Sequence, residues 1–148
     1  MSNTKAGPLS GVRILDFTWA AAGPQGTLLA GFLGAEVIKV ESVRRLDLMR
    51  RGMSTLYEGF DNSPHLNDFN FNKLGIRLDL SKPEGQKLAL SLVSVCDAAV
   101  DNFRPNVLER LGVGYSAMRR VNPSIILLSA ANGGSTGPES KFAGYAGI

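Results

Sequence analysis

The stretch VRILDFTWAAAGPQGTLLAGFLGAEVIKV (residues 12–40) decides the fold of this chain. It begins with VRILDF (12–17), a short apolar run with β-branched residues that indicates a buried strand. Residues 25–33 place four large apolar side chains at helical spacing, and Gly34 follows where helices commonly end. VIKV (37–40) is then a second strand. This order predicts two parallel strands joined by a right-handed crossover helix.

A second unit of the same kind begins near residue 76. IRLDL (76–80) alternates apolar and polar residues as a strand does. Ser81 to Glu84 has the pattern of a capping box, so we expect a helix to start at Ser81 and to bury an apolar face over residues 88–96. Ala98 to Val100 then leads into a further strand that ends at Asp101.

The remaining segments complete an α/β pattern. Short helices are predicted at about 105–111 and 116–121, and IILLS (125–129) is a last buried strand. Residues 42–71 show no sustained periodicity and are predicted to be a long loop. Loops of this length inside a compact domain usually have a function. We therefore predict a Rossmann-like, mostly parallel sheet flanked by helices and cut short on its C-terminal side.

Composition excludes several classes of protein. With 44% hydrophobic and 20% charged residues, the 148-residue chain is typical of a globular domain. It has neither an apolar run that could span a bilayer nor a secretory signal, and its one cysteine, Cys96, cannot form an internal disulfide. These features predict a cytoplasmic protein without a membrane partner. The net charge of +3 suits a phosphate-bearing ligand but is too small to indicate nucleic acid.

Ligands of open α/β sheets bind beyond the carboxyl ends of the strands, which here means residues 18–26, 41–45, 80–82 and 102–104. Residues 23–26 (GPQG) open a helix, so they could either receive an anion on free N–H groups or simply make a tight turn. They do not form a dinucleotide-binding G-x-G-x-x-G motif. Glu41 could serve as the ribose-binding acid of a nicotinamide site.

The segment Asn102-Phe103-Arg104 is the most distinctive of these strand ends. Phe103 could stack on an adenine ring or pack in the core, and Arg104 and Arg110 could contact phosphates or remain solvated. The only histidine, His65, is interpreted as a surface residue, and Cys96 as a buried spectator. No metal site or catalytic triad can be assembled. From the residues alone, the chain is a ligand-binding α/β domain.

Motifs in a fixed order run along nearly the whole chain, and together they resemble the N-terminal part of the family III CoA-transferases, the CaiB/BaiF type. No single motif is diagnostic, but the ordered set is hard to obtain by chance. The motifs are PLSGVRILDFT (8–18), AGP (22–24), LGAEVIKVE (33–41), NK (72–73), LDL (78–80), PEG (83–85), DNFRP (101–105), LG (111–112), NP (122–123) and TGP (136–138).

The resemblance implies that residues 1–148 are the N-terminal part of a CoA-binding large domain, with the rest of that domain and a small domain lying beyond the chain. It implies an interlocked homodimer, and acyl-CoA and a carboxylic acid as substrates, with coenzyme A as the carried group and no metal. The CoA contacts that it implies are Ala21, Ala22, Leu78, Asp79, Leu80, Ser81, Asn102, Phe103, Arg104, Arg110 and Tyr145.

Two positions depart from the pattern at the expected phosphate contacts. Ser81 stands where the formyl-CoA transferases have a lysine, and the adjacent Lys82 could compensate. Ser42 stands where they have an arginine, and Arg44 or Arg45 could substitute.

Two further departures narrow the implied activity. Racemases of the family carry a histidine base in the segment that holds Tyr145, and a tyrosine with a pKa of about 10 is a poor base, so transferase is favoured. Ala21 replaces a glutamine of the formyl-CoA:oxalate enzymes, which disfavours oxalate as the acceptor.

The family's nucleophile is an aspartate, which we expect beyond Ile148. The chain would then hold no catalytic residue and would be inactive alone. The alternatives are an acyl-CoA racemase or a carnitine-type CoA enzyme, a stand-alone CoA-binding module, and, more distantly, a nicotinamide-binding oxidoreductase domain.

Overall fold

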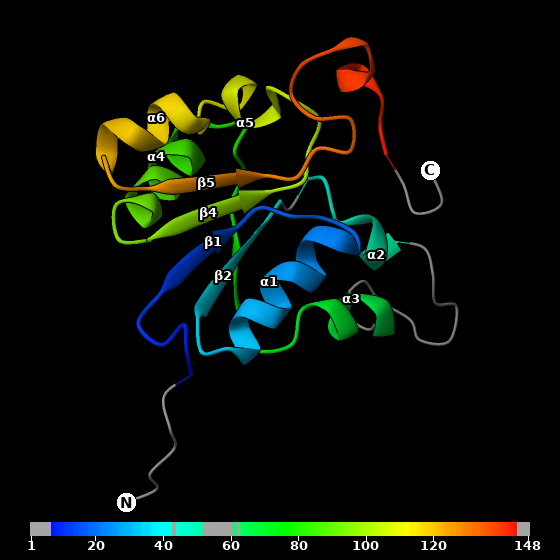
Figure 1. Cartoon of the computed structure of the whole chain (residues 1–148), viewed down its shortest axis with the longest axis vertical. Coiled ribbons are helices and arrows are strands. Elements are labelled where there is room, and N and C mark those ends of the chain that lie inside the picture. Colours follow the sequence, from blue (N-terminus) through cyan, green and yellow to red (C-terminus); the bar gives the residue numbers. More distant parts are fainter. Residues whose placement is uncertain (1–6, 43, 52–60, 62, 145–148) are drawn as a thin grey trace, which may run out of the picture.

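The computed structural model describes residues 7–42, 44–51, 61 and 63–144, which form one sheet with helices on both faces (Figure 1). The sheet has five strands in the order β3-β2-β1-β4-β5, and every neighbouring pair is parallel. The predicted α/β class with a parallel sheet is confirmed. The strands are β1 (Arg13–Asp16), β2 (Glu36–Glu41), β3 (Lys73–Arg77), β4 (Ala98–Asp101) and β5 (Ile126–Ser129).

Different helices cover the two faces of the sheet. Figure 1 shows α1 and α3 on one face, and α4, α5 and α6 on the other. None of the helices in the described part of the chain is long and apolar enough to cross a membrane. The helices are α1 (Ala22–Phe32), α2 (Leu48–Arg51), α3 (Pro64–Phe69), α4 (Pro83–Val93), α5 (Val107–Arg110) and α6 (Tyr115–Val121), followed by a 3₁₀ turn, η1 (Pro138–Lys141).

The strand order creates one point at which the chain changes direction across the sheet. From β1 the chain builds outward through β2 to β3, and α4 then carries it back to β4 on the other side of β1. Loops that follow β1 and β4 therefore leave the sheet side by side but run to opposite faces. In open parallel sheets this position is where ligands bind.

Strand β3 lies three residues earlier than the predicted strand 76–80. Its register pairs residues 73–77 with residues 37–41 of β2, and β2 ends at Glu41. The Leu78 N–H donates one more hydrogen bond to the Glu41 carbonyl (2.8 Å), and the chain then turns through a bond from the Lys82 N–H to the Asp79 carbonyl (3.0 Å). Pairing stops because the partner strand ends, although the alternating pattern continues.

The prediction of an irregular loop over residues 42–71 was wrong, because the segment contains α2 and α3. The Ser63 hydroxyl accepts the Leu66 N–H at the start of α3 (3.4 Å), and Pro64 occupies the first helical turn. The carboxylate of Asp47 accepts the Met49 N–H at the start of α2 (3.0 Å). Both short helices therefore begin at a side-chain cap.

Two helix starts also differ from the prediction. Helix α1 begins at Ala22, three residues before the predicted Gln25, so the Gly-Pro pair lies within its first turn. The predicted capping box at Ser81 was wrong: Lys82 precedes α4, and no side chain caps it. The Ser81 hydroxyl instead donates to the Asp79 carboxylate (2.6 Å).

The main core lies between the sheet and the α4–α6 face. Its fully buried members include Leu15 and Phe17 from the first strand region and Val93, Val113 and Met118 from the opposite layer. Each such side chain contributes roughly 1.5–3 kcal/mol relative to exposure. This core fixes the position of β1 and β4, and with it the direction of the loops that follow them.

Candidate functional site

The loop after β1 is tied to the loop after β4 by one side chain. The amide oxygen of Asn102 accepts the Trp19 N–H (2.8 Å), and its amide nitrogen donates to the Trp19 carbonyl (2.8 Å). Both polar backbone groups of Trp19 are thereby satisfied by a residue 83 positions away. Asn102 therefore joins the two strand ends that flank the switch point of the sheet.

Aromatic packing reinforces this junction. The rings of Trp19 and Phe103 meet edge to face, with centroids 5.5 Å apart and planes at 79°. The Phe103 N–H donates to the Asp101 carboxylate (3.0 Å), which fixes the turn after β4. Phe103 also packs against the main core, so the structure gives its ring the packing role. Contact with an adenine stays a prediction.

A buried ion pair holds the two ends of the same loop. The Lys39 ammonium donates to the Thr18 carbonyl (2.6 Å) and lies 3.8 Å from the Asp47 carboxylate. That carboxylate accepts the Ala20 N–H at 3.1 and 3.2 Å. Ala20 has a φ of 60°, a left-handed conformation that costs a non-glycine residue about 1–2 kcal/mol. The bond from Asp47 helps to maintain it.

Asp16, at the end of β1, is fully buried beneath this loop. Its carboxylate accepts the Thr18 N–H (2.9 Å), the Thr27 hydroxyl (2.6 Å) and the Lys73 ammonium (3.0 Å). Burial alone would raise the pKa of Asp16, but the nearby ammonium groups of Lys39 and Lys73 and the two hydroxyl donors outweigh it and lower the pKa. Asp16 is therefore an ionised structural carboxylate whose oxygens are already engaged.

The first turn of α1 lies directly beside the junction. A Cβ added to Gly23 would come within 2.6 Å of the Thr18 Cβ and 3.0 Å of the Asn102 Cγ, whereas one added to Gly26 would meet nothing within 4 Å. Gly23 is thus needed for close packing. Ala21 and Ala22 stand at the start of this turn, half-buried and exposed respectively, and no side chain caps the helix.

The predicted CoA contacts after β3, Leu78 to Ser81, divide into apolar side chains in the core and polar ones at the surface. Leu78 is buried in the main core and Leu80 packs against it, so their side chains are turned away from a surface ligand. Asp79 accepts the Ser81 N–H (3.1 Å) and lies 3.3 Å from the guanidinium of Arg44. The Ser81 hydroxyl is the main cause of a lowered pKa of Asp79, with Arg44 and Lys82 adding to it.

Three cationic residues that follow β2 and β3, namely Arg44, Arg45 and Lys82, face solvent. Ser42 shapes the turn that carries them, because its hydroxyl accepts both the Arg44 and the Arg45 N–H (3.2 Å each). The side chain of Arg44 is 69% exposed, and Arg45 and Lys82 are exposed as well. These three predicted phosphate contacts lie near the carboxyl ends of neighbouring strands.

Glu41 does not have the freedom that a ribose-binding acid needs. Arg50 donates to both of its carboxylate oxygens (2.6 and 2.8 Å) and also to Asp61 (2.7 Å). Burial would raise the pKa of Glu41, but the hydrogen bonds and charge of Arg50 lower it. The nicotinamide hypothesis loses its one candidate ligand.

The remaining predicted residues fall into four groups. Arg104 and Arg110 are exposed, one after β4 and the other on α5. Tyr145 lies outside the described residues. His65 is half-buried on α3. Cys96 is buried, and burial raises the pKa of its thiol to about 11, so it is inert as predicted.

The candidate site therefore has two parts. We call Thr18–Ala22, Asn102 and Phe103 the inner site, and Ser42, Arg44, Arg45 and Asp79–Lys82 the outer site. The inner site follows β1 and β4, and the outer site follows β2 and β3. Sequence inspection missed Lys39 and Asp47; a lysine inside an apolar strand was the one available indication of the first.

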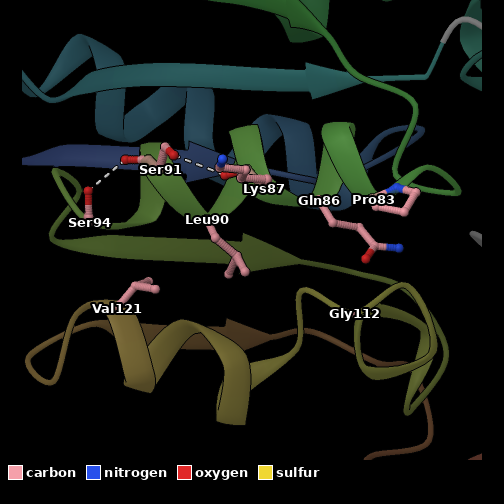
Figure 2. A pocket seen from close by; sticks show the side chains of 8 residues that line it. All are labelled: Pro83, Gln86, Lys87, Leu90, Ser91, Ser94, Gly112 and Val121. Atoms are coloured by element: carbon pink, nitrogen blue, oxygen red, sulfur yellow. Dashed lines mark hydrogen bonds between the residues drawn. The ribbon is translucent and has the colours of Figure 1, made fainter.

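A groove of about 470 Å³ lies elsewhere, between α4 and α6 (Figure 2). The hydroxyls of Ser91 and Ser94 in its wall already donate to carbonyls of their own helix (3.0 and 2.7 Å). Within the described ranges, no group of histidine, cysteine, aspartate or glutamate side chains could hold a metal ion.

Comparison with known proteins places these features in context. Residues 9–148 match the model of CoA-transferase family III. The human succinyl-CoA:glutarate CoA-transferase is 41% identical over 145 residues, covering 98% of this chain and 32% of that protein. A formyl-CoA:oxalate CoA-transferase of Afipia carboxidovorans is 38% identical over 121 residues, 82% of this chain and 28% of its own.

Solved structures agree with these matches. A CaiB/BaiF family protein of Brucella suis superposes with a TM-score of 0.84 at 31% identity, over 95% of this chain and 38% of that one. A short-chain dehydrogenase/reductase family protein, at a TM-score of 0.51 and 12% identity, shares the fold alone. The chain spans about a third of the length of the curated relatives that it matches.

Proposed function

The chain belongs to CoA-transferase family III, and from this premise we propose that it supplies the CoA-binding part of an enzyme that moves CoA between an acyl-CoA thioester and a carboxylic acid. The observation that carries the proposal is the Asn102 side chain, which joins the loops after β1 and β4 at the switch point of the sheet. A rigid junction at this position is suited to holding a ligand against reacting groups.

The proposed CoA contacts divide between the two parts of the site. In the inner site, backbone groups of Ala21 and Ala22 and the residues Asn102 and Phe103 would hold the thioester end, with Arg104 next to them in the chain. Leu80 in the outer site and Leu78 just before it would contribute only backbone groups, since their side chains pack on the core. Exposed cations of Arg44, Arg45, Lys82 and Arg110 suit the negatively charged phosphates of CoA.

The proposed chemistry uses an aspartate beyond Ile148 as the nucleophile. Its carboxylate attacks the thioester carbonyl, the carbon–sulfur bond breaks, and CoA leaves as a thiolate from a mixed anhydride. The thiolate then attacks the aspartyl carbonyl and releases the donor acid, which leaves CoA as an enzyme thioester. The acceptor carboxylate attacks that thioester, and CoA returns through a second anhydride to the acceptor.

One residue of the inner site, Ala21, bears on the identity of the acceptor acid. Relatives carry the names of glutarate and oxalate transferases. Ala21 lacks the amide that the resemblance assigns to the oxalate enzymes, so an acid other than oxalate is proposed. We also propose, from the share of the relatives that the chain spans, that it is the N-terminal part of a large domain. We further propose that the intact protein is an interlocked homodimer, as the family resemblance implies, and that it acts in the cytoplasm.

Trp19 provides a direct test, because it is the only tryptophan of the chain and lies in the inner site. Titration with CoA should change its emission in a saturable way, and NAD at the same concentration should not. A response to NAD with none to CoA would overturn the proposal. The purified chain should also fail to exchange labelled acid into acyl-CoA; turnover would place the nucleophile within residues 1–148.

A further inference from the structure

The backbone of Thr18–Ala20 is held from three separate parts of the chain. Asp16 accepts the Thr18 N–H (2.9 Å) next to it, but the other bonds come from distant elements. Lys39 in β2 donates to the Thr18 carbonyl (2.6 Å), Asn102 holds both groups of Trp19 (2.8 Å each), and Asp47 before α2 accepts the Ala20 N–H (3.1 Å).

Lys39 and Asp47 contact the backbone of this loop more closely than they contact each other. The two charged groups lie 3.8 Å apart, farther than either lies from the loop backbone that it contacts. Their side chains are 3% and 1% exposed. A buried pair of this kind adds little stability over apolar residues of similar size, so stability alone does not account for it.

The conformation at Ala20 gives the pair a specific task. Its φ of 60° sets the direction in which the chain leaves β1, and α1 begins two residues later at Ala22. Strained backbone of this sort persists only where its surroundings determine it, and it gathers at ligand sites. Without the Asp47 acceptor, Ala20 would relax, and both the Trp19 ring and the first turn of α1 would move.

We propose that Asp47, supported by Lys39, is a positioning residue for the acyl-CoA site. It fixes the Thr18–Ala20 loop in its binding conformation before the ligand arrives, and it does so without touching the ligand. The inference rests on the proposed function, since it assumes that the inner site binds CoA. If only a fraction of the molecules hold the loop in its binding conformation, the apparent affinity is the intrinsic affinity multiplied by that fraction.

Three variants separate positioning from stability. Asp47→Ala removes the acceptor of the Ala20 N–H. Asp47→Asn keeps an acceptor oxygen but removes the charge that faces Lys39. Asp97→Ala is the control for losing a carboxylate that accepts a backbone N–H, because the exposed Asp97 accepts that of Arg13 (2.8 Å) at the opposite edge of the sheet.

The readouts are CoA affinity by calorimetry, Trp19 emission, and the urea midpoint of the chain. Asp47→Ala should weaken CoA binding about tenfold or more and shift Trp19 emission, by the population argument above. Asp47→Asn should unfold at lower urea yet keep both affinity and emission. Asp97→Ala should lower the midpoint alone. Equal CoA affinity in Asp47→Ala and the unmodified chain, or equal loss in Asp47→Asn and Asp47→Ala, overturns the proposal.

A fourth variant covers the case in which Asp47→Ala does not fold. The double change Lys39→Met with Asp47→Leu replaces the pair by apolar side chains, which buried pairs tolerate. It should fold and still bind CoA about tenfold more weakly; unchanged affinity overturns the proposal. If the unmodified chain binds no CoA, the proposed function itself fails and the inference falls with it, whereas binding that survives the loss of Asp47 refutes the inference alone.

Discussion

The inner and the outer site are built in opposite ways. In the inner site, the bonds from Lys39, Asp47 and Asn102 join residues 21 to 83 positions apart, and the two charged side chains are buried. In the outer site, Ser42 and Asp79 bond to N–H groups only two or three residues away. The long-range contact there, between Arg44 and Asp79, involves an arginine that is 69% exposed.

This contrast follows from solvent access and suits the two ends of a CoA ester. A buried polar loop must satisfy its backbone groups inside the protein, so it becomes fixed in one shape. An exposed segment can leave its groups to water and adapt to a flexible, charged ligand. Rigidity then lies where bonds would change, and adaptability lies where phosphates would bind.

The strongest test of the contrast is Lys73→Met. The Lys73 ammonium donates to Asp16 (3.0 Å), Thr27 (2.8 Å) and the Pro24 carbonyl (2.9 Å), and its side chain is 2% exposed. Its loss leaves the buried Asp16 carboxylate undercompensated, so we expect the free energy of unfolding in urea to fall by about 3–5 kcal/mol.

Arg77→Met is the control for that change. Arg77 donates to Asp61 (3.1 Å), but the two side chains are 56% and 72% exposed. The expected loss is at most about 1 kcal/mol, as for other surface ion pairs. Similar losses in both variants would remove the distinction between buried and exposed ion pairs in this fold.

Asn102→Ala should have the next largest effect. It leaves the N–H and carbonyl of Trp19 without their partners, at a cost of about 1–3 kcal/mol in unfolding free energy. It should also broaden and shift Trp19 emission, because the ring loses its fixed place against Phe103. Ser124→Ala, which removes a hydroxyl that donates to Asn122, should leave emission unchanged. An unshifted spectrum in Asn102→Ala would mean that the loop is held without this residue.

The dependence of folding stability on pH in the acid range is a third test, because it reports the pKa of the buried Asp16. The folded-state pKa of Asp16 lies below its ordinary value of about 3.9, so its ionised form adds stability that is present above that value and lost as pH falls through the folded pKa. Thr27→Val removes one hydroxyl donor and should raise that pKa. The acid-unfolding midpoint should therefore move to higher pH, and a midpoint that moves to lower pH would contradict the assignment.

Arg44→Ala should give the smallest effect, and one confined to binding. Its exposed contact with Asp79 predicts a change in unfolding free energy within about 0.5 kcal/mol. CoA affinity should fall by about two- to fivefold, and the difference should shrink as salt rises. A large loss of stability would show that the outer site is as rigid as the inner one.

Several elements could be predicted because their cause is local. Continuous patterns in the sequence indicate the apolar strands β1, β2 and β4 and the glycine after α1. The parallel direction of the strands was inferred from these patterns. The caps of α2 and α3 were also local: Ser63-Pro64 is a helix start that the lack of periodicity concealed. The register of β3 was not local, since it depends on where β2 ends.

The inner site shows why its key residues escaped prediction. Lys39 and Asp47 are charged, and charged side chains are ordinarily exposed, so neither suggested a buried pair. Their roles depend on a contact between β2, the start of α2 and the loop after β1, which only the folded chain brings together. Asn102 was selected as a ligand contact, which stays a prediction, but its two hydrogen bonds to the Trp19 backbone were not foreseen.

Gly23 has a consequence for how this surface can vary. Its missing side chain is the space that the Thr18 methyl group and Asn102 occupy, while Gly26, one turn along the same helix, borders open space. A library randomised at both positions and selected for folded protein should therefore retain glycine at 23 and accept most residues at 26. Substitutions that aim to alter specificity can therefore be made at position 26, on the outward side of this helix turn. Position 23, three residues earlier, accepts no side chain.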